Sequence, residues 1–232
     1  MSVLGIETAT RVCAAAIASG GKVLAEAAME ERNIHAERLM SLIDEVLART
    51  GTSPQQLDAI AVSIGPGSFT GLRIGLSVAK GLAYATAKPL VAVPTLESLA
   101  RRAAGSGIVH PLILSLLDAR RDEVYCQFFT VAGGIVTGLD EPHDRTLDQV
   151  AEEIGSRDVF VTGEASDKFR AFVESARPEI RHSVRFAERP VSLCSGGMVA
   201  VTGEELLARG RTDDPSLLEP RYIKEFFFKT RP

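Results

Sequence analysis

A glycine-rich segment, Gly65 to Gly75, contains the residue types in this chain that most suggest a chemical role. It reads GPGSFTGLRIG and joins an apolar run ending at Ile64 to a stretch of small residues beginning near Thr70. Glycines permit tight turns, and Ser68 or Thr70 can cap a helix, so the junction predicts a strand, a loop and a helix. The spacing matches neither the Walker phosphate loop nor the dinucleotide fingerprint GxGxxG. The segment therefore favours close packing over phosphate binding.

Acidic and hydroxyl residues follow two predicted strands at equivalent places. Glu7, Thr8 and Thr10 follow the first strand, and Asp118 ends a later one. Carboxylate and hydroxyl oxygens bind Mg²⁺, so these four residues are candidates for a cofactor-binding cleft, now vestigial. The alternative for the first group is a capped turn with one solvated carboxylate. The segment DARRDE at Asp118 has no glycine that would let backbone N–H groups surround a phosphate, and it suits an exposed hairpin.

The histidines and cysteines predict no metal site and no catalytic nucleophile. His35 lies near the start of a predicted helix, but Leu39 stands four residues later, where a second metal-binding histidine would be needed. We therefore expect His35 to be structural. Cys13, Cys126 and Cys194 are widely spaced and lack a CxxC pattern, which indicates buried, reduced thiols.

Composition describes a soluble globular protein of one large domain or two lobes. The chain has 232 residues, of which 45% are hydrophobic and 24% charged, and its net charge is −4. This charge does not support a basic face for nucleic acid. No apolar run is long enough to span a membrane and the start lacks the basic residues of a signal peptide, so we expect a cytoplasmic protein.

The tail 221–232 mixes basic and aromatic residues, which suits either RNA contact or docking on the fold.

An order of three strands, a helix, a strand and a helix occurs twice. The first round predicts strands 3–6, 12–18, 22–28, 59–64 and 89–93 with helices 34–50, 70–87 and 94–105. The second predicts strands 112–117, 123–130, 135–138 and 159–162 with helices 147–154, from 166, and 197–209. This repetition indicates an α/β fold of the actin-like, ribonuclease H-like duplicated class, in which each lobe has a mixed sheet flanked by helices. We expect a first lobe over 1–105 and a second over 106–232, the latter including the last helix and the tail.

The two helices at 34–50 and 70–87 have more apolar surface than one sheet can cover. Within the second helix, Gly71, Gly75, Ala79 and Ala83 recur every four residues and predict a smooth ridge for close approach of another backbone. We expect an interface with another subunit; the alternative is burial within the lobe. The expected interface residues are His35, Leu39, Met40, Ile43, Gly71, Gly75, Leu76 and Ala79.

Four segments resemble the TsaB (YeaZ) family. They are GPGSFTGLRIG at 65–75, LGIETAT at 4–10, NIHAERL at 33–39 and LDARRDEVY at 117–125. After about Thr130 the likeness is one of pattern, apart from PRYI at 220–223. The resemblance implies an actin-like fold and a non-catalytic dimerisation or scaffold subunit of the complex that transfers a threonylcarbamoyl group to N6 of the adenosine beside the anticodon of tRNA. The catalytic paralogue TsaD is longer and has a metal-binding histidine pair where His35 and Leu39 stand.

The resemblance also implies partners. TsaD would pair with the first lobe's two helices, a second copy of the chain would pair through the same surface, and the ATPase TsaE would join the complex, with tRNA contacted indirectly. No cofactor is expected on the isolated chain. In the complex, ATP and Mg²⁺ could bind at a boundary between subunits. Two other functions stay open: an ATP-dependent transferase or kinase using Glu7 and Asp118, and a metallopeptidase-like protein.

Overall fold

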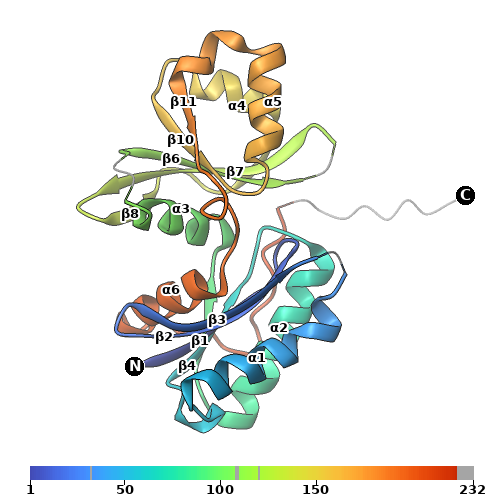
Figure 1. The fold of residues 1–232 in the computed structure, drawn as a ribbon, viewed down its shortest axis with the longest axis vertical. Helices are drawn as coiled ribbons and strands as arrows, with labels where there is room; N and C mark the ends of the chain where they lie inside the picture. Colours follow the sequence, from blue (N-terminus) through green and yellow to red (C-terminus); the bar gives the residue numbers. More distant parts are fainter. Residues whose placement is uncertain (32, 108–109, 120, 224–232) are drawn as a thin grey trace, which may run out of the picture.

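The computed structural model describes residues 1–31, 33–107, 110–119 and 121–223, which form two sheets stacked along the long axis (Figure 1). The first sheet has the order β3-β2-β1-β4-β5, with β1 (Ser2–Glu7), β2 (Val12–Ser19), β3 (Lys22–Glu30), β4 (Ala59–Ser63) and β5 (Leu90–Val93). The second has the order β11-β10-β6-β7-β8, with β6 (Leu112–Asp118), β7 (Glu123–Ala132), β8 (Ile135–Gly138), β10 (Val159–Thr162) and β11 (Val184–Phe186). A further strand, β9 (His143–Thr146), pairs with β7.

The helices lie close to their predicted positions. They are α1 (His35–Thr50), α2 (Phe69–Thr86), α3 (Thr95–Gly105), α4 (Leu147–Ile154), α5 (Ser166–Ala176) and α6 (Gly196–Ala208), with short 3₁₀ turns η1 (Pro54–Gln56) and η2 (Pro178–Ser183). Ser68 caps α2 as predicted, since its hydroxyl accepts a hydrogen bond from the Gly71 N–H. None of the helices in the described part of the chain is long and apolar enough to cross a membrane.

The structure confirms the internal duplication. In each lobe the first strand pairs antiparallel with the second and parallel with the strand that follows α1 or α4: β1 pairs with β2 and β4, and β6 with β7 and β10. The strand order is therefore the same in both sheets. A glycine with positive φ also follows this parallel strand in both lobes: Gly65 at 114° after β4 and Gly163 at 104° after β10. The α/β duplicated fold class is confirmed.

The division of the helices between the lobes differs from the prediction. The helix assigned to the first lobe, α3, packs on the second sheet, against Ile113, Leu117 and Phe129. The helix assigned to the second lobe, α6, instead covers the first sheet, where Val199 and Leu206 are buried. In each lobe, one of the helices that cover the sheet therefore comes from the other half of the sequence. The C-terminal helix, α6, belongs structurally to the first lobe.

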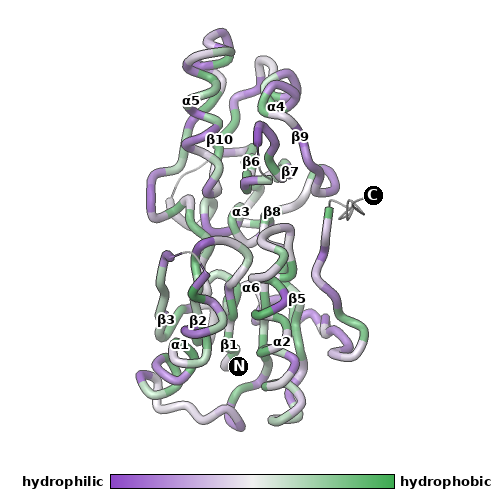
Figure 2. Tube along the Cα trace, turned by 90° about the vertical axis from the view of Figure 1, so that its right-hand side faces the viewer, coloured by the Kyte–Doolittle hydropathy of each residue, from purple (hydrophilic) through white to green (hydrophobic). Residues whose placement is uncertain are grey.

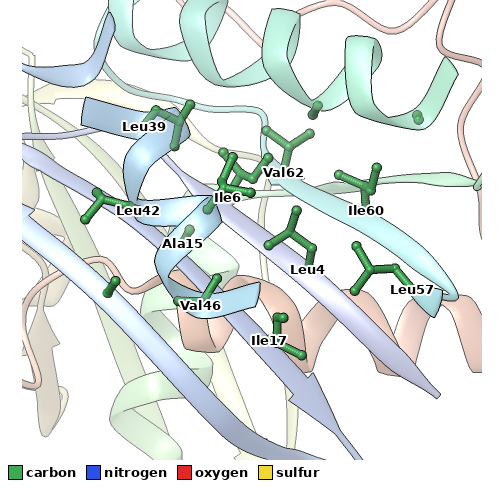
Figure 3. Packing of buried hydrophobic residues seen from close by; sticks show 14 of the residues in the cluster. Leu4, Ile6, Ala15, Ile17, Leu39, Leu42, Val46, Leu57, Ile60 and Val62 are labelled. Carbon is green, nitrogen blue, oxygen red and sulfur yellow. The ribbon is translucent and has the colours of Figure 1, made fainter. Parts of the chain in front are cut away.

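The core of the first lobe lies between its sheet and the helices α1 and α2. Leu39, Leu42 and Val46 of α1 recur at helical spacing and are buried over Leu4 and Ile6 of β1 (Figure 3). Burial of a leucine or valine side chain contributes about 1.5–3 kcal/mol to stability. This packing fixes both helices on one face of the sheet and leaves their other sides outward.

Small residues allow α6 to lie very close to the opposite face of the first sheet. Gly5 of β1 faces Gly196 and Ala200 of α6, and a Cβ atom added at Gly5 would come closer than 3.0 Å to their backbone atoms. A Cβ atom added at Gly203 of α6 would likewise come closer than 3.0 Å to the Cβ atom of Ala61 in β4. The alanine-rich sequence of β2 thus has a packing reason, because larger side chains would lift the helix from the sheet.

We expect Gly5→Ala to lower the free energy of unfolding by about 3 kcal/mol, because backbone on both sides of the contact prevents relaxation. The matched control is Gly105→Ala at the end of α3, where an added Cβ meets nothing within 4 Å and no loss is expected. Urea unfolding followed by circular dichroism measures both variants. Equal stability of the two would contradict this account of the α6 packing.

Candidate functional site

The turn between β1 and β2 is buried where the two lobes meet. Glu7 and Thr8 are fully buried and Thr10 is nearly so, which makes the alternative of a capped turn with a solvated carboxylate wrong. Oε1 of Glu7 accepts a hydrogen bond of 2.6 Å from the Ala9 N–H. Among the described residues, Glu7 Oε2 and Thr8 Oγ1 have no hydrogen-bond partner. Burial raises the pKa of Glu7 from 4.5 to about 7, against the lowering effect of the Ala9 hydrogen bond.

A second acidic residue, Glu164, faces this turn from the other lobe, and sequence analysis missed it. It follows β10, and its charge contributes to the raised pKa of Glu7. Burial also raises the pKa of Glu164, while the charge and backbone N–H of Arg11 act in the opposite direction. The signal was present in the sequence, since Glu164 follows Gly163, the second-round counterpart of Gly65.

Asp118 is engaged within its own lobe. Its carboxylate accepts a hydrogen bond of 2.8 Å from Nζ of Lys168 in α5, which also donates to the Glu123 carbonyl at 3.1 Å. A cation at Asp118 would have to displace this ammonium group. In the described ranges, no group of three or more histidine, cysteine, aspartate or glutamate side chains is placed to hold a metal ion.

The histidine and the thiols lie in the interior. His35 is 7% exposed at the start of α1, and Leu39 is 1% exposed in the core beneath it. Cys13, Cys126 and Cys194 are free and buried, as predicted. Burial raises the pKa of Cys13 to about 11 and that of Cys126 to about 12, so both remain thiols at neutral pH.

The glycines of the 65–75 segment make room for the β1–β2 turn. A Cβ atom at Gly67 would come closer than 3.0 Å to the Ala9 carbonyl, and one at Gly71 or Gly75 would meet Thr8 in the same way. The Ser68 N–H donates to the Ala9 carbonyl at 2.7 Å. The backbone that approaches this smooth ridge is therefore the chain's own turn.

This finding corrects the expected interface. Seven of its eight residues are buried within the first lobe: His35, Leu39, Ile43, Gly71, Gly75, Leu76 and Ala79. Met40 of α1 is 46% exposed. Buried side chains do not contact a partner directly, so an interface on these helices must use other residues.

The outward side of α2 carries a second row of small residues. Ser77, Gly81 and Ala85 are exposed and recur every four residues, and a Cβ atom at Gly81 would meet nothing within 4 Å. Beside them lie the partly buried Ile74, Val78 and Leu82. The small-residue ridge that is open to a partner thus lies on the opposite side of α2 from the predicted one. We name this surface, with Met40, the outer face.

Two lobes of identical strand order, each covered by helices, define the actin-like class. Component A of (R)-2-hydroxyglutaryl-CoA dehydratase from Acidaminococcus fermentans shares the fold, with a TM-score of 0.53 at 12% identity over 90% of this chain and 99% of that one. A family model described as TsaD, tRNA N6-adenosine threonylcarbamoyltransferase, matches residues 22–226, and the chain belongs to this family.

Individual relatives agree with that assignment. The tRNA threonylcarbamoyladenosine biosynthesis protein TsaB of Escherichia coli (strain K12) is 38% identical over 126 residues, which is 54% of this chain and 53% of the relative. The chain spans about half the length of the curated relatives it matches. YeaZ from Pseudomonas aeruginosa has a TM-score of 0.78 at 27% identity over 95% of this chain and 99% of that one. The resemblance to the TsaB (YeaZ) family is confirmed.

The raised pKa of Glu7 predicts a pH-dependent stability. Over the range between 4.5 and about 7 the folded chain retains a proton that the unfolded chain releases, so the free energy of unfolding falls as pH rises through this range and levels off above it. Glu7→Gln keeps an acceptor for the Ala9 N–H and removes this titration. Relative to the wild type, we expect the variant to gain up to ~3 kcal/mol between about pH 4.5 and pH 8.

Urea unfolding at several pH values measures this difference. Glu174→Gln, which replaces an exposed acid of α5, is the matched control and should follow the wild-type curve. Parallel curves for Glu7→Gln and the wild type would show that Glu7 does not titrate as described.

Proposed function

We propose that this protein is a non-catalytic subunit of the machinery that forms N6-threonylcarbamoyladenosine in tRNA. It pairs through the outer face with a TsaD-type catalytic paralogue. The proposal rests mainly on Gly81, which is exposed on the outward side of α2 in the interior of the helix. A Cβ atom added there would meet nothing within 4 Å. Such a glycine costs about 1 kcal/mol relative to alanine, and close approach of a partner helix offsets that cost.

The chemistry of the acidic residues supports a role without catalysis. Glu7 is buried with a pKa of about 7, so a large fraction of it is protonated near neutral pH and is a poor ligand for Mg²⁺. Asp118 is held by Lys168. The space at Gly67, Gly71 and Gly75 is occupied by the β1–β2 turn, and the space at Gly65 by the Arg221 carbonyl, so these glycines do not leave room for a phosphate.

The outer face suits a helix pair on a related chain. The row Ser77, Gly81 and Ala85 lets a helix approach closely, and Ile74 and Val78 supply apolar contacts beside it. The same face can pair two copies of this chain, and the catalytic paralogue competes with that homodimer. A TsaE-type ATPase joins the complex in the cytoplasm, ATP and Mg²⁺ bind at a subunit boundary, and tRNA is contacted through the partners.

Gly81→Leu tests the outer face. The added side chain points into open space, so the chain stays folded, while a partner helix is pushed away. We expect binding to the TsaD-type paralogue to weaken at least tenfold, which corresponds to about 1.4 kcal/mol. Sedimentation velocity of mixtures measures the pairing, and circular dichroism measures the fold.

Gly75→Leu is the matched control on the same helix. Its side chain would collide with the buried Thr8, so this variant should lose stability rather than pairing alone. Full pairing by Gly81→Leu, with native circular dichroism, would show that the outer face is not the interface.

The functional readout is the modified nucleoside itself. In cells depleted of the native protein, the wild-type gene should restore N6-threonylcarbamoyladenosine in tRNA, measured by mass spectrometry, and Gly81→Leu should not.

Calorimetry of the isolated protein with ATP and Mg²⁺ tests the rival function, an ATP-dependent transferase or kinase. Tight binding with turnover would favour that rival over the scaffold.

A further inference from the structure

After α6 the chain runs along the first lobe and toward the second. Residues 212–223, here named the strap, lie beside α2 in both views (Figures 1 and 2). The strap begins at the sheet edge, where the Asp213 N–H donates to the Leu90 carbonyl at 2.9 Å and its carboxylate accepts from the Ala92 N–H at 2.8 Å. Leu218 then packs against the core of the lobe. The strap is therefore fixed to the β5 edge and the core.

The far end of the strap is held by the glycine segment. The Arg221 N–H donates to the Ile64 carbonyl at 2.7 Å. At Gly65, whose φ is 114°, an added Cβ would lie 2.6 Å from the Arg221 carbonyl oxygen. Both the conformation and the space at this position require glycine. The loop between β4 and α2 is thus shaped to receive the backbone of the strap.

Aromatic and cationic contacts complete this attachment. The ring of Tyr222 lies 5.1 Å from that of Phe69, centroid to centroid. Arg73 places its guanidinium 3.8 Å from the Phe69 centroid and donates from Nε to the Tyr222 hydroxyl at 3.0 Å. The first turn of α2 therefore binds the strap at Phe69 and Arg73, which precede Ser77 of the outer face in the same row of every fourth residue.

One side chain of the strap reaches the second lobe. The Arg221 guanidinium donates to Oε2 of Glu141, in the connection between β8 and β9, at 2.5 Å. Both side chains are exposed, so the ion pair contributes little to overall stability. Ion pairs of Arg189 with Glu30 and of Arg101 with Glu205 also join the lobes. The strap is thus a tether between α2 and the second lobe.

We propose that the glycine segment is the binding site for the strap, and that the bound strap sets the relative position of the two lobes through the ion pair between Arg221 and Glu141. Loss of the pair leaves each lobe folded, because the sheets and cores do not depend on it. The proposal implies more than one lobe position, and the ion pair shifts their populations by as much as it favours one of them. An exposed ion pair can shift such an equilibrium by up to about fivefold, or ~1 kcal/mol.

Charge reversal and charge exchange test the tether on the full chain. Spin labels are attached at Glu37→Cys in α1 and Glu174→Cys in α5, two exposed positions on different lobes, while the native cysteines are buried. Pulsed electron resonance then gives the distribution of inter-lobe distances. We expect Arg221→Glu to broaden or shift this distribution, and the double exchange Arg221→Glu with Glu141→Arg to restore it.

Arg185→Glu is the matched control, because it breaks an exposed ion pair with Asp158 inside the second lobe. It should leave the distance distribution unchanged. If Arg221→Glu alters the circular dichroism spectrum, Glu141→Gln removes the same pair from the other side. A distribution that neither substitution changes, or that the double exchange fails to restore, overturns the proposal. These outcomes are independent of the pairing measured with Gly81→Leu.

Discussion

The close packing of the β1–β2 turn against the start of α2 is the contact on which the rest of the first lobe depends. Because Gly67, Gly71 and Gly75 carry no side chains, the carbonyls of Ala9 and Thr8 and the Thr8 hydroxyl lie directly against the start of α2, and the Ser68 N–H donates to the Ala9 carbonyl. This contact fixes the rotation of α2 about its axis. It thereby decides which residues of α2 enter the core and which form the outer face.

The same contact explains the state of Glu7. A turn pressed between a helix and the opposite lobe excludes water, and desolvation favours the neutral carboxyl group. The nearby Glu164 acts in the same direction, since two carboxylates in a buried site disfavour each other's ionisation. Tight packing of this turn excludes water and favours a neutral carboxyl group, whereas cation binding would need an ionised carboxylate. The turn is tightly packed, which suits a protein that acts through its surface.

The sequence was sufficient for the elements and the duplication, because strand and helix periods and the glycine turns are local signals. It missed β9, whose sequence HDRT carries no apolar pattern, and the short edge strand β11, and it assigned α3 and α6 to the wrong sheets. Nothing local distinguishes a helix that covers its own sheet from one that crosses to the other. The prediction from the glycine ridge was wrong for a related reason: the spacing indicates that some group approaches Gly71 and Gly75 closely, but not that this group is Thr8 of the chain's own β1–β2 turn.

The duplication also shows where the two lobes have diverged. Gly163 and Gly65 occupy equivalent places, after β10 and β4, and both have positive φ, at 104° and 114°. At Gly163 the space is taken by the Leu116 carbonyl of the lobe's own first strand, whereas at Gly65 it is taken by Arg221 of the strap. The equivalent glycine therefore allows close packing within the second lobe, at Gly163, and attachment of the distant strap in the first lobe, at Gly65. Because that segment also contacts α2 and Glu141, the glycine segment joins the outer-face helix, the turn of Glu7 and the second lobe in one continuous set of contacts.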